Sequence, residues 1–368
     1  MQYKVSIKRK CYLLSVLLMT VWLTGCVQEE FESTPSPAGN GIRFTLTVPD
    51  VNLPSVSSRT MTGTGTAKKE DEIETVDILV FDMSKTPAVF LEWVSATGVT
   101  QDLADNSTVS FSAVLSPTTA STCIVVVANK ELDNIVSGFT KGATTKVEAM
   151  EKMLHTQTGK WLADGSTTGG YTRIPMYGEK VISKITPSMD PITGINMKRM
   201  LARIDIRNNS ATSNFTVEEV YLANYNTTGY IAPAWNTNGQ VTDPVPDTPV
   251  LPAGSGKMTE EGDAILYSVN GNTPYDGEIY TFESLAAEDA GGAGADGEAS
   301  RKDATCLIVK GRIGTGESTF YRVDFTKNGN TGEQVEYLPL KRNHKYIITI
   351  TQALGTGYKS FSEALASY

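Results

Sequence analysis

The segment that decides the fold reads Ile42-Arg43-Phe44-Thr45-Leu46-Thr47-Val48. Apolar and polar residues alternate strictly along it, which is the pattern of a β-strand with one buried face. Four side chains share the apolar face: Ile42, Phe44, Leu46 and Val48. The stretch from Asp50 to Lys69 that follows is rich in Ser, Thr and Gly, so the strand is predicted to be separable from the rest of the chain.

The remainder of the chain is also predicted to be mostly β. Short apolar segments separated by Gly, Pro, Asn and Asp predict strands at residues 73–81, 89–94, 108–115, 123–128, 215–223, 278–282, 306–313, 319–325 and 345–351. One helix is predicted over Thr145 to Leu154, because Thr145-x-x-Glu148 fits a capping box. This pattern is typical of β-sandwiches with one or two short helices.

The N-terminus predicts export. A basic stretch precedes the apolar run Cys11 to Trp22, which is too short to span a bilayer. Leu23-Thr24-Gly25-Cys26 then looks like a bacterial lipoprotein signal, in which cleavage before the Cys and acylation of its thiol leave a lipid anchor. Cys26 is therefore the predicted lipidation site. An ordinary secretory signal with a chance Cys is the alternative.

Charge and composition limit the partners and cofactors. The net charge of −9 argues against nucleic acid as the main partner, because neutralising phosphates needs clustered Lys and Arg. With two His and four Cys in 368 residues, no metal or other cofactor is expected. Cys123 and Cys306 each lie in an apolar run, so they are expected to be buried thiols rather than a disulfide pair.

No motif points to catalysis. The Gly-rich stretch from Gly291 to Gly297 is not followed by the Lys-Ser/Thr of a phosphate-binding loop. Neither His155 nor His344 has the surroundings of a catalytic triad. The chain is therefore predicted not to be an enzyme. Trp93, Trp161 and Trp235 leave open a glycan-stacking surface.

Several segments in the same order resemble the fimbrillins, the pilin subunits of the lipoprotein-derived type V pili of Gram-negative anaerobes. The resemblance spans almost the whole chain, although each segment alone is weakly specific. The segments are Leu23–Cys26, Ile42–Val48, the loop around Arg59, Val76–Asp82, Ile124–Asn129, Ile174–Glu179, Arg199–Ile206 and Leu340–Ile350.

The resemblance implies two transthyretin-like β-sandwich domains and a route of assembly. The precursor is lipidated, and an Arg-specific surface protease then cuts after an Arg in the loop that follows the first strand. Arg59 is the only Lys or Arg between Arg43 and Lys68, so the implied cut lies between Arg59 and Thr60. The first strand then leaves, and the C-terminal segment of a neighbouring subunit refills its groove.

The implied organisation has a signal peptide at residues 1–25 and a tether with the removable strand at 26–59. An N-terminal sandwich at 60–200 and a C-terminal sandwich at 201–368 follow. The tail at residues 358–368 is the candidate donor strand, with four candidate residues: Tyr358, Phe361, Leu365 and Tyr368. The alternative is that this tail packs on its own domain.

The predicted function is a structural subunit of a cell-surface fimbrium that polymerises by protease-triggered donor-strand exchange. Its predicted partners are other fimbrial subunits in a homo- or hetero-polymer, the Arg-specific protease, and the outer membrane through the lipid on Cys26 before processing. The alternative is a surface lipoprotein or tip subunit that binds host or dietary glycan, or a host protein.

Overall fold

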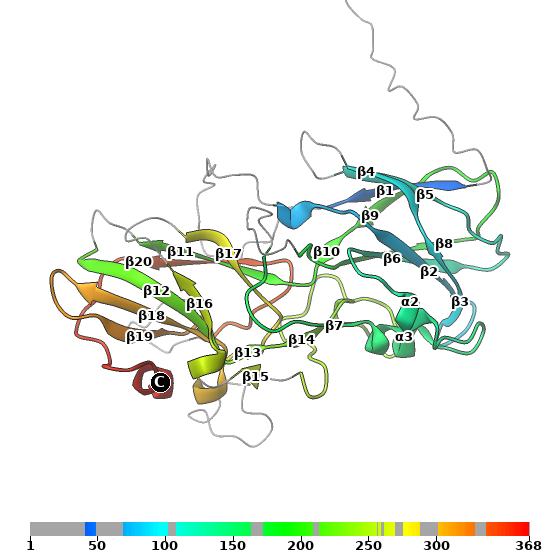
Figure 1. The fold of residues 1–368 in the computed structure, drawn as a ribbon. Coiled ribbons are helices and arrows are strands. Elements are labelled where there is room, and N and C mark those ends of the chain that lie inside the picture. Colours follow the sequence, from blue (N-terminus) through cyan, green and yellow to red (C-terminus); the bar gives the residue numbers. More distant parts are fainter. Residues whose placement is uncertain are drawn as a thin grey trace, which may run out of the picture. The chain divides into compact units, whose positions relative to one another are not determined.

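Short β-strands make up most of the regular secondary structure in the described part of the chain (Figure 1). The computed structural model describes residues 41–48, 69–101, 108–162, 172–208, 213–255, 257–258, 261–268, 275–287, 301–327 and 336–367. From Gly41 onward the chain forms one compact unit. The predicted mostly β fold is confirmed.

The first sandwich pairs a four-stranded with a five-stranded sheet. The four-stranded sheet has the order β4-β5-β1-β9, with bounds Thr97–Gln101, Thr108–Ala113, Ile42–Thr47 and Ile192–Asn196. The five-stranded sheet has the order β10-β8-β6-β2-β3, with bounds Lys198–Arg199, Met176–Ile182, Thr122–Ala128, Val76–Asp82 and Val89–Ser95.

Strands β2 and β6 are apolar at nearly every position because both of their faces are buried. One face packs against the four-stranded sheet in a core that contains Ile78, Val80 and Phe111. The opposite face, which carries Leu79 and Val125, packs against a second cluster. Such unbroken apolar runs are typical of strands covered on both sides.

Helices cover this second face (Figure 1). They are α2, Asp133–Val136, and α3, Lys146–Lys152. The predicted capping box of α3 is present: the Thr145 hydroxyl accepts from the Glu148 amide, and the Glu148 carboxylate accepts from the Thr145 amide. Helix α3 therefore begins where the sequence indicated.

The second sandwich repeats the strand order of the first. Its sheets are β17-β11-β20, with bounds Tyr275–Thr281, Ala202–Asn208 and Lys345–Ile350, and β16-β12-β18-β19, with bounds Ile265–Ser268, Phe215–Ala223, Cys306–Ile313 and Thr319–Val323. In both sandwiches the first strand lies between an antiparallel and a parallel neighbour: β1 between β5 and β9, and β11 between β17 and β20. The order β8-β6-β2-β3 likewise matches β19-β18-β12-β16.

One small strand pair joins the two halves of the chain: β7, Leu154–Thr156, with β14, Thr228–Tyr230. A second pair, β13, Tyr225–Asn226, with β15, Lys257–Met258, lies within the second half. Two 3-10 turns, η1 and η2, span Lys69–Asp71 and Glu261–Asp263. The cluster that contains Leu79 also contains Leu201 and Phe282 from the second half. The division into domains near residue 200 stays a prediction.

The C-terminal tail contains a helix that was not expected. Helix α5, Phe361–Ala366, begins at Ser360, whose hydroxyl accepts from the Glu363 amide. Phe361 and Ala364 are buried against β18 and its neighbours, in a cluster with Cys306 and Ile308. In this chain the tail therefore packs on its own sandwich.

Candidate functional site

Strand β1 lies in the interior of its sheet, bonded along both edges. It runs antiparallel to β5 over six residue pairs, from Ile42 opposite Ala113 to Thr47 opposite Thr108. On its other side it runs parallel to β9, with Phe44 opposite Ile192. We call the space that β1 fills, bounded by β5, β9 and the facing strands β2 and β6, the β1 groove.

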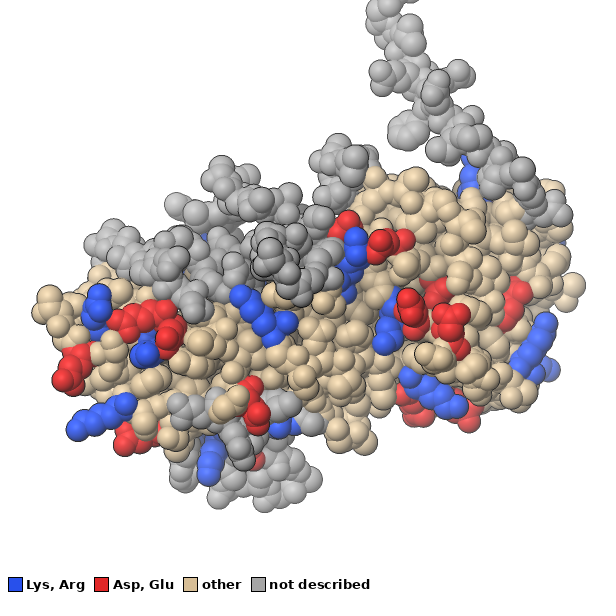
Figure 2. Space-filling model, in the orientation of Figure 1, with Lys and Arg blue, Asp and Glu red and all other residues tan. Residues whose placement is uncertain are grey.

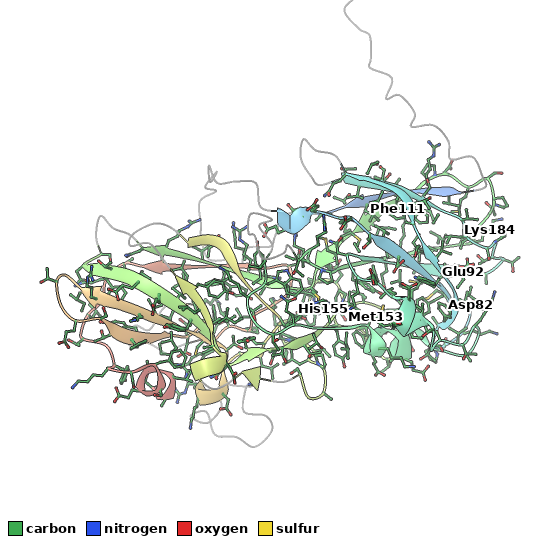
Figure 3. The ribbon with its side chains drawn as sticks, in the orientation of Figure 1. Asp82, Glu92, Phe111, Met153, His155 and Lys184 are labelled. Carbon is green, nitrogen blue, oxygen red and sulfur yellow. The ribbon has the colours of Figure 1, made fainter. Side chains whose placement is uncertain are left out.

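The β1 groove is apolar and tightly filled. The side chains of Ile42, Phe44, Leu46 and Val48 are 4%, 1%, 0% and 3% exposed, respectively. The rings of Phe44 and Phe111, the latter labelled in Figure 3, stack with centroids 4.9 Å apart and planes 7° apart. Each of these buried side chains contributes about 1.5–3 kcal/mol, so the groove depends on a strand being present.

Several predicted site residues lie outside the described part of the chain. They are the lipidation site Cys26, both residues of the cleavage site, Arg59 and Thr60, and the terminal Tyr368. Among the other tail residues, the backbone of Tyr358 pairs with that of Phe320, on β19. Phe361 and Leu365 belong to α5. The removable role of β1 and the donor role of the tail stay predictions.

A buried charge network holds η1, the first described element after β1. The Glu70 carboxylate accepts from Arg203 Nη1 at 2.8 Å and from the Tyr280 hydroxyl at 2.7 Å. Arg203 also donates to Asp205, through Nε at 2.8 Å, and Asp71 pairs with Arg199. Burial disfavours the charged form of Arg203, but Glu70 and Asp205 outweigh burial and raise its pKa.

Sequence reasoning missed this network. Arg203 is 133 residues from Glu70 along the chain, and no local pattern pairs charges so far apart. The sequence signal for this network was the presence of Arg199 and Arg203 in an apolar segment, where an unpaired charge would be costly.

Burial shifts the pKa values of His155 and of the two described cysteines. The His155 ring packs against Trp161 and Phe282 in tilted contacts, with centroids 5.2 Å and 6.3 Å from its own, and burial lowers its pKa to about 4. Burial raises the pKa of the Cys123 and Cys306 thiols to about 12, and the two residues form no disulfide. Thiols of such high pKa are poor nucleophiles.

The described ranges contain no cluster of three His, Cys, Asp or Glu side chains that could hold a metal ion. Within the same ranges, no helix has the length and apolar character needed to cross a membrane. On the face shown in Figure 2, acidic and basic side chains are scattered in small groups rather than gathered by sign.

The three tryptophans proposed for glycan stacking take part in packing. Trp161 is 4% exposed and belongs to the cluster on the helical side of β2 and β6, against which Trp93 and Trp235 also pack. Trp235 makes an edge contact with Tyr230 at 5.0 Å between centroids. Glycan binding stays a prediction.

Two repeated β-sandwiches, with an interior first strand near the N-terminus, define a structural β-sandwich protein. The chain belongs to the major fimbrial subunit (FimA) family, whose model matches residues 42–240. It is therefore a component of a cell-surface fimbrium that assembles with other fimbrial subunits.

Solved structures match most of this chain at low sequence identity. The tip fimbrial protein Mfa3 of Porphyromonas gingivalis is 16% identical, with a TM-score of 0.48 over 85% of this chain and 96% of that one. A putative cell adhesion protein of Parabacteroides distasonis is also 16% identical, with a TM-score of 0.46 over 88% of this chain and 92% of that one. No curated protein matches the chain.

Proposed function

We propose that this fimbrial subunit enters the fimbrium by strand exchange. The precursor reaches the outer membrane and is lipidated on Cys26. An Arg-specific surface protease then cuts between Arg59 and Thr60, and β1 leaves together with the lipid. An extended strand from another subunit fills the β1 groove.

The interior position of β1 carries this proposal. In the order β4-β5-β1-β9, loss of β1 leaves two strand edges unpaired at once and uncovers the core beneath them. Open edges beside apolar surface pair readily with any suitable strand. A donor strand restores both hydrogen-bond ladders and refills the side-chain pockets, which is β-augmentation.

The repeated topology supports the same proposal. The first strand of the second sandwich, β11, is supplied by the segment that leaves the first sandwich after β9 and β10. Within this one chain, the segment that leaves the first sandwich thus supplies a strand that completes the second. Exchange into the β1 groove would repeat that relation between two chains.

The network around η1 supports a clean separation of β1. Lys69–Asp71 follows the cleavage loop and is bound to Arg199 and Arg203. A cut at residue 59 therefore leaves the downstream segment anchored at Glu70 and Asp71. The fragment that carries β1 has no covalent tie left to the folded chain.

The test is Arg59→Ala in cells that express the full chain. We expect the variant to keep its N-terminal segment and to be absent from fimbriae, whereas the unaltered chain starts at Thr60 and migrates in detergent-resistant ladders. Lys68→Ala is the matched control, and it should assemble normally. Normal assembly of Arg59→Ala protein would refute cleavage at this site as the trigger.

A further inference from the structure

We infer that the strand entering the β1 groove comes from a subunit of different sequence, and not from the tail of a second copy of this chain. This inference rests on the proposed strand exchange. It follows from the shape and polarity of the groove, compared with the sequence and conformation of the tail.

The groove has four consecutive inward positions with strict requirements. They are occupied by Ile42, Phe44, Leu46 and Val48, none more than 4% exposed. The two middle positions are the most demanding, because Phe44 stacks on Phe111 and Leu46 is fully buried. A strand with small or charged side chains at these positions leaves cavities or buries a charge.

The described side chains that β5 and β9 turn into the groove carry no charge: they include Val109 and Phe111 from β5 and Ile192 and Ile195 from β9. Two lysines of this half already have partners: half-buried Lys180 donates to the Thr193 carbonyl, and buried Lys146 pairs with Glu179 at 2.6 Å. Met176 and Glu179 are three residues apart on β8, so their side chains point to opposite faces of the sheet. Met176 faces the groove's core, so the Lys146–Glu179 pair lies on the other face.

The tail cannot meet these requirements in any register. Within residues 358–368, every register that fills all four inward positions with the face of Phe361 and Leu365 also turns Glu363 inward, since the three alternate. Glu363 then takes the place of Leu46 or of Phe44, depending on the register. The other face of residues 358–368 places only Ser and Ala at the two middle positions: Ser360, Ser362, Ala364 and Ala366.

The tail is also occupied within its own chain. Phe361 is 1% exposed, and its ring makes an edge contact with Tyr221 at 5.2 Å between centroids. Arg322 Nη1 donates to the Leu365 carbonyl at 2.6 Å, and the Lys359 amide donates to the Glu363 carboxylate at 3.1 Å. These contacts favour the helix over an extended donor strand.

The preceding strand is no substitute, because β20 is part of the second core. It pairs with β11 over six residues, and its Tyr346 is 5% exposed in that core. Withdrawing β20 would open the second sandwich. The occupant that fits the β1 groove is thus a strand with alternating apolar residues, an aromatic ring at the second inward position and no inward charge.

Peptide exchange into the full-length chain, cut after Arg59, tests this inference. Four fluorescent peptides are compared by anisotropy: residues 41–49, the same peptide with Leu46→Glu, residues 358–368, and that tail peptide with Glu363→Leu. The two variants are matched, because one adds and the other removes a carboxylate at an inward position.

We expect the 41–49 peptide to enter the groove and its Leu46→Glu variant to bind at least about 100-fold more weakly, because a carboxylate is buried without a partner. The natural tail peptide should be comparably weak, and Glu363→Leu should recover at least about tenfold of the difference, with Lys359 still inward when Phe361 takes the second inward position. Binding of the natural tail within about tenfold of the 41–49 peptide would overturn the inference.

The remaining outcomes separate the inference from the proposed function. If the tail peptide stays weak after Glu363→Leu, the charge mismatch is not the cause and the reasoning from polarity is wrong. If even the 41–49 peptide does not enter, strand exchange itself fails and the inference fails with it.

Discussion

Replacing Phe44 by Ala should loosen β1 without disturbing the rest of the molecule. Phe44 is 1% exposed and stacks on Phe111 at 4.9 Å, so truncation removes both the buried ring and its stacking contact. A buried Phe→Ala change costs about 3–5 kcal/mol. At about 1.4 kcal/mol per factor of ten, retention of β1 should weaken by roughly 150-fold to 4,000-fold.

The assay uses full-length chain cut after Arg59. Cut protein is incubated and passed over a size-exclusion column at intervals, and the fragment ending at Arg59 that remains bound is quantified by mass. The control is Arg43→Ala, because Arg43 is exposed on the same strand and should change retention by less than about threefold.

Equal retention of β1 in the Phe44→Ala and Arg43→Ala proteins would refute this reasoning. It would mean that the apolar face of β1 does not hold the strand in the chain. The hydrogen-bond ladders alone would then account for its retention.

Three further predictions concern stability. Arg203→Met leaves Glu70 and Asp205 buried without their cation and should lower the free energy of unfolding by about 3–5 kcal/mol in urea titrations. The control is Arg312→Met, which removes an ion pair whose Arg side chain is 47% exposed and should cost less than about 1 kcal/mol. The pKa of His155 is lowered from 6.5 to about 4, so the unfolded chain binds a proton that the folded chain does not, and stability should fall as the pH falls through this window. The partly exposed ring limits this loss to about 1–3 kcal/mol. His155→Phe should reduce it when melting temperatures are compared at about pH 7.5, above the window, and at about pH 5, inside it. Gly311→Ala would place a Cβ 2.3 Å from the Thr216 carbonyl oxygen and should destabilise the second sandwich by about 1–3 kcal/mol, whereas Gly262→Ala, with nothing within 4 Å, should not.

The sequence predicted those elements whose signals are local. The alternation in residues 42–48 predicted β1 and its buried face, and Thr145-x-x-Glu148 predicted the start of α3. In both cases the pattern that stabilises the element lies within the element. These local patterns were sufficient for the fold class.

The tail shows how a local signal was overlooked. Ser360-x-x-Glu363 has the form of a capping box, and Phe361, Ala364 and Leu365 recur at helical spacing. Read in this way, the sequence predicts α5 rather than a strand. The resemblance to fimbrillins implied a donor strand at the same residues instead.

Long-range pairing could not be predicted. Arg342 donates to Glu283 Oε2 from Nε at 2.8 Å and from Nη2 at 2.6 Å, and these two residues are 59 positions apart. Arg342 is only 2% exposed and also donates to the carbonyls of Tyr230 and Ile231. Nothing near Arg342 in the sequence marks it as buried, because its partners are brought together only by the fold.

The two-sided bonding of the first strand in each sandwich has a mechanical consequence. β11 is held by β17 along one edge and by β20 along the other, and β1 is held likewise by β5 and β9. Tension along such a strand loads both rows of hydrogen bonds simultaneously, as a shear, because the bonds lie across the direction of pull. Joints of this kind fail by sliding as a whole rather than by unzipping one bond at a time, which suits a subunit of a filament.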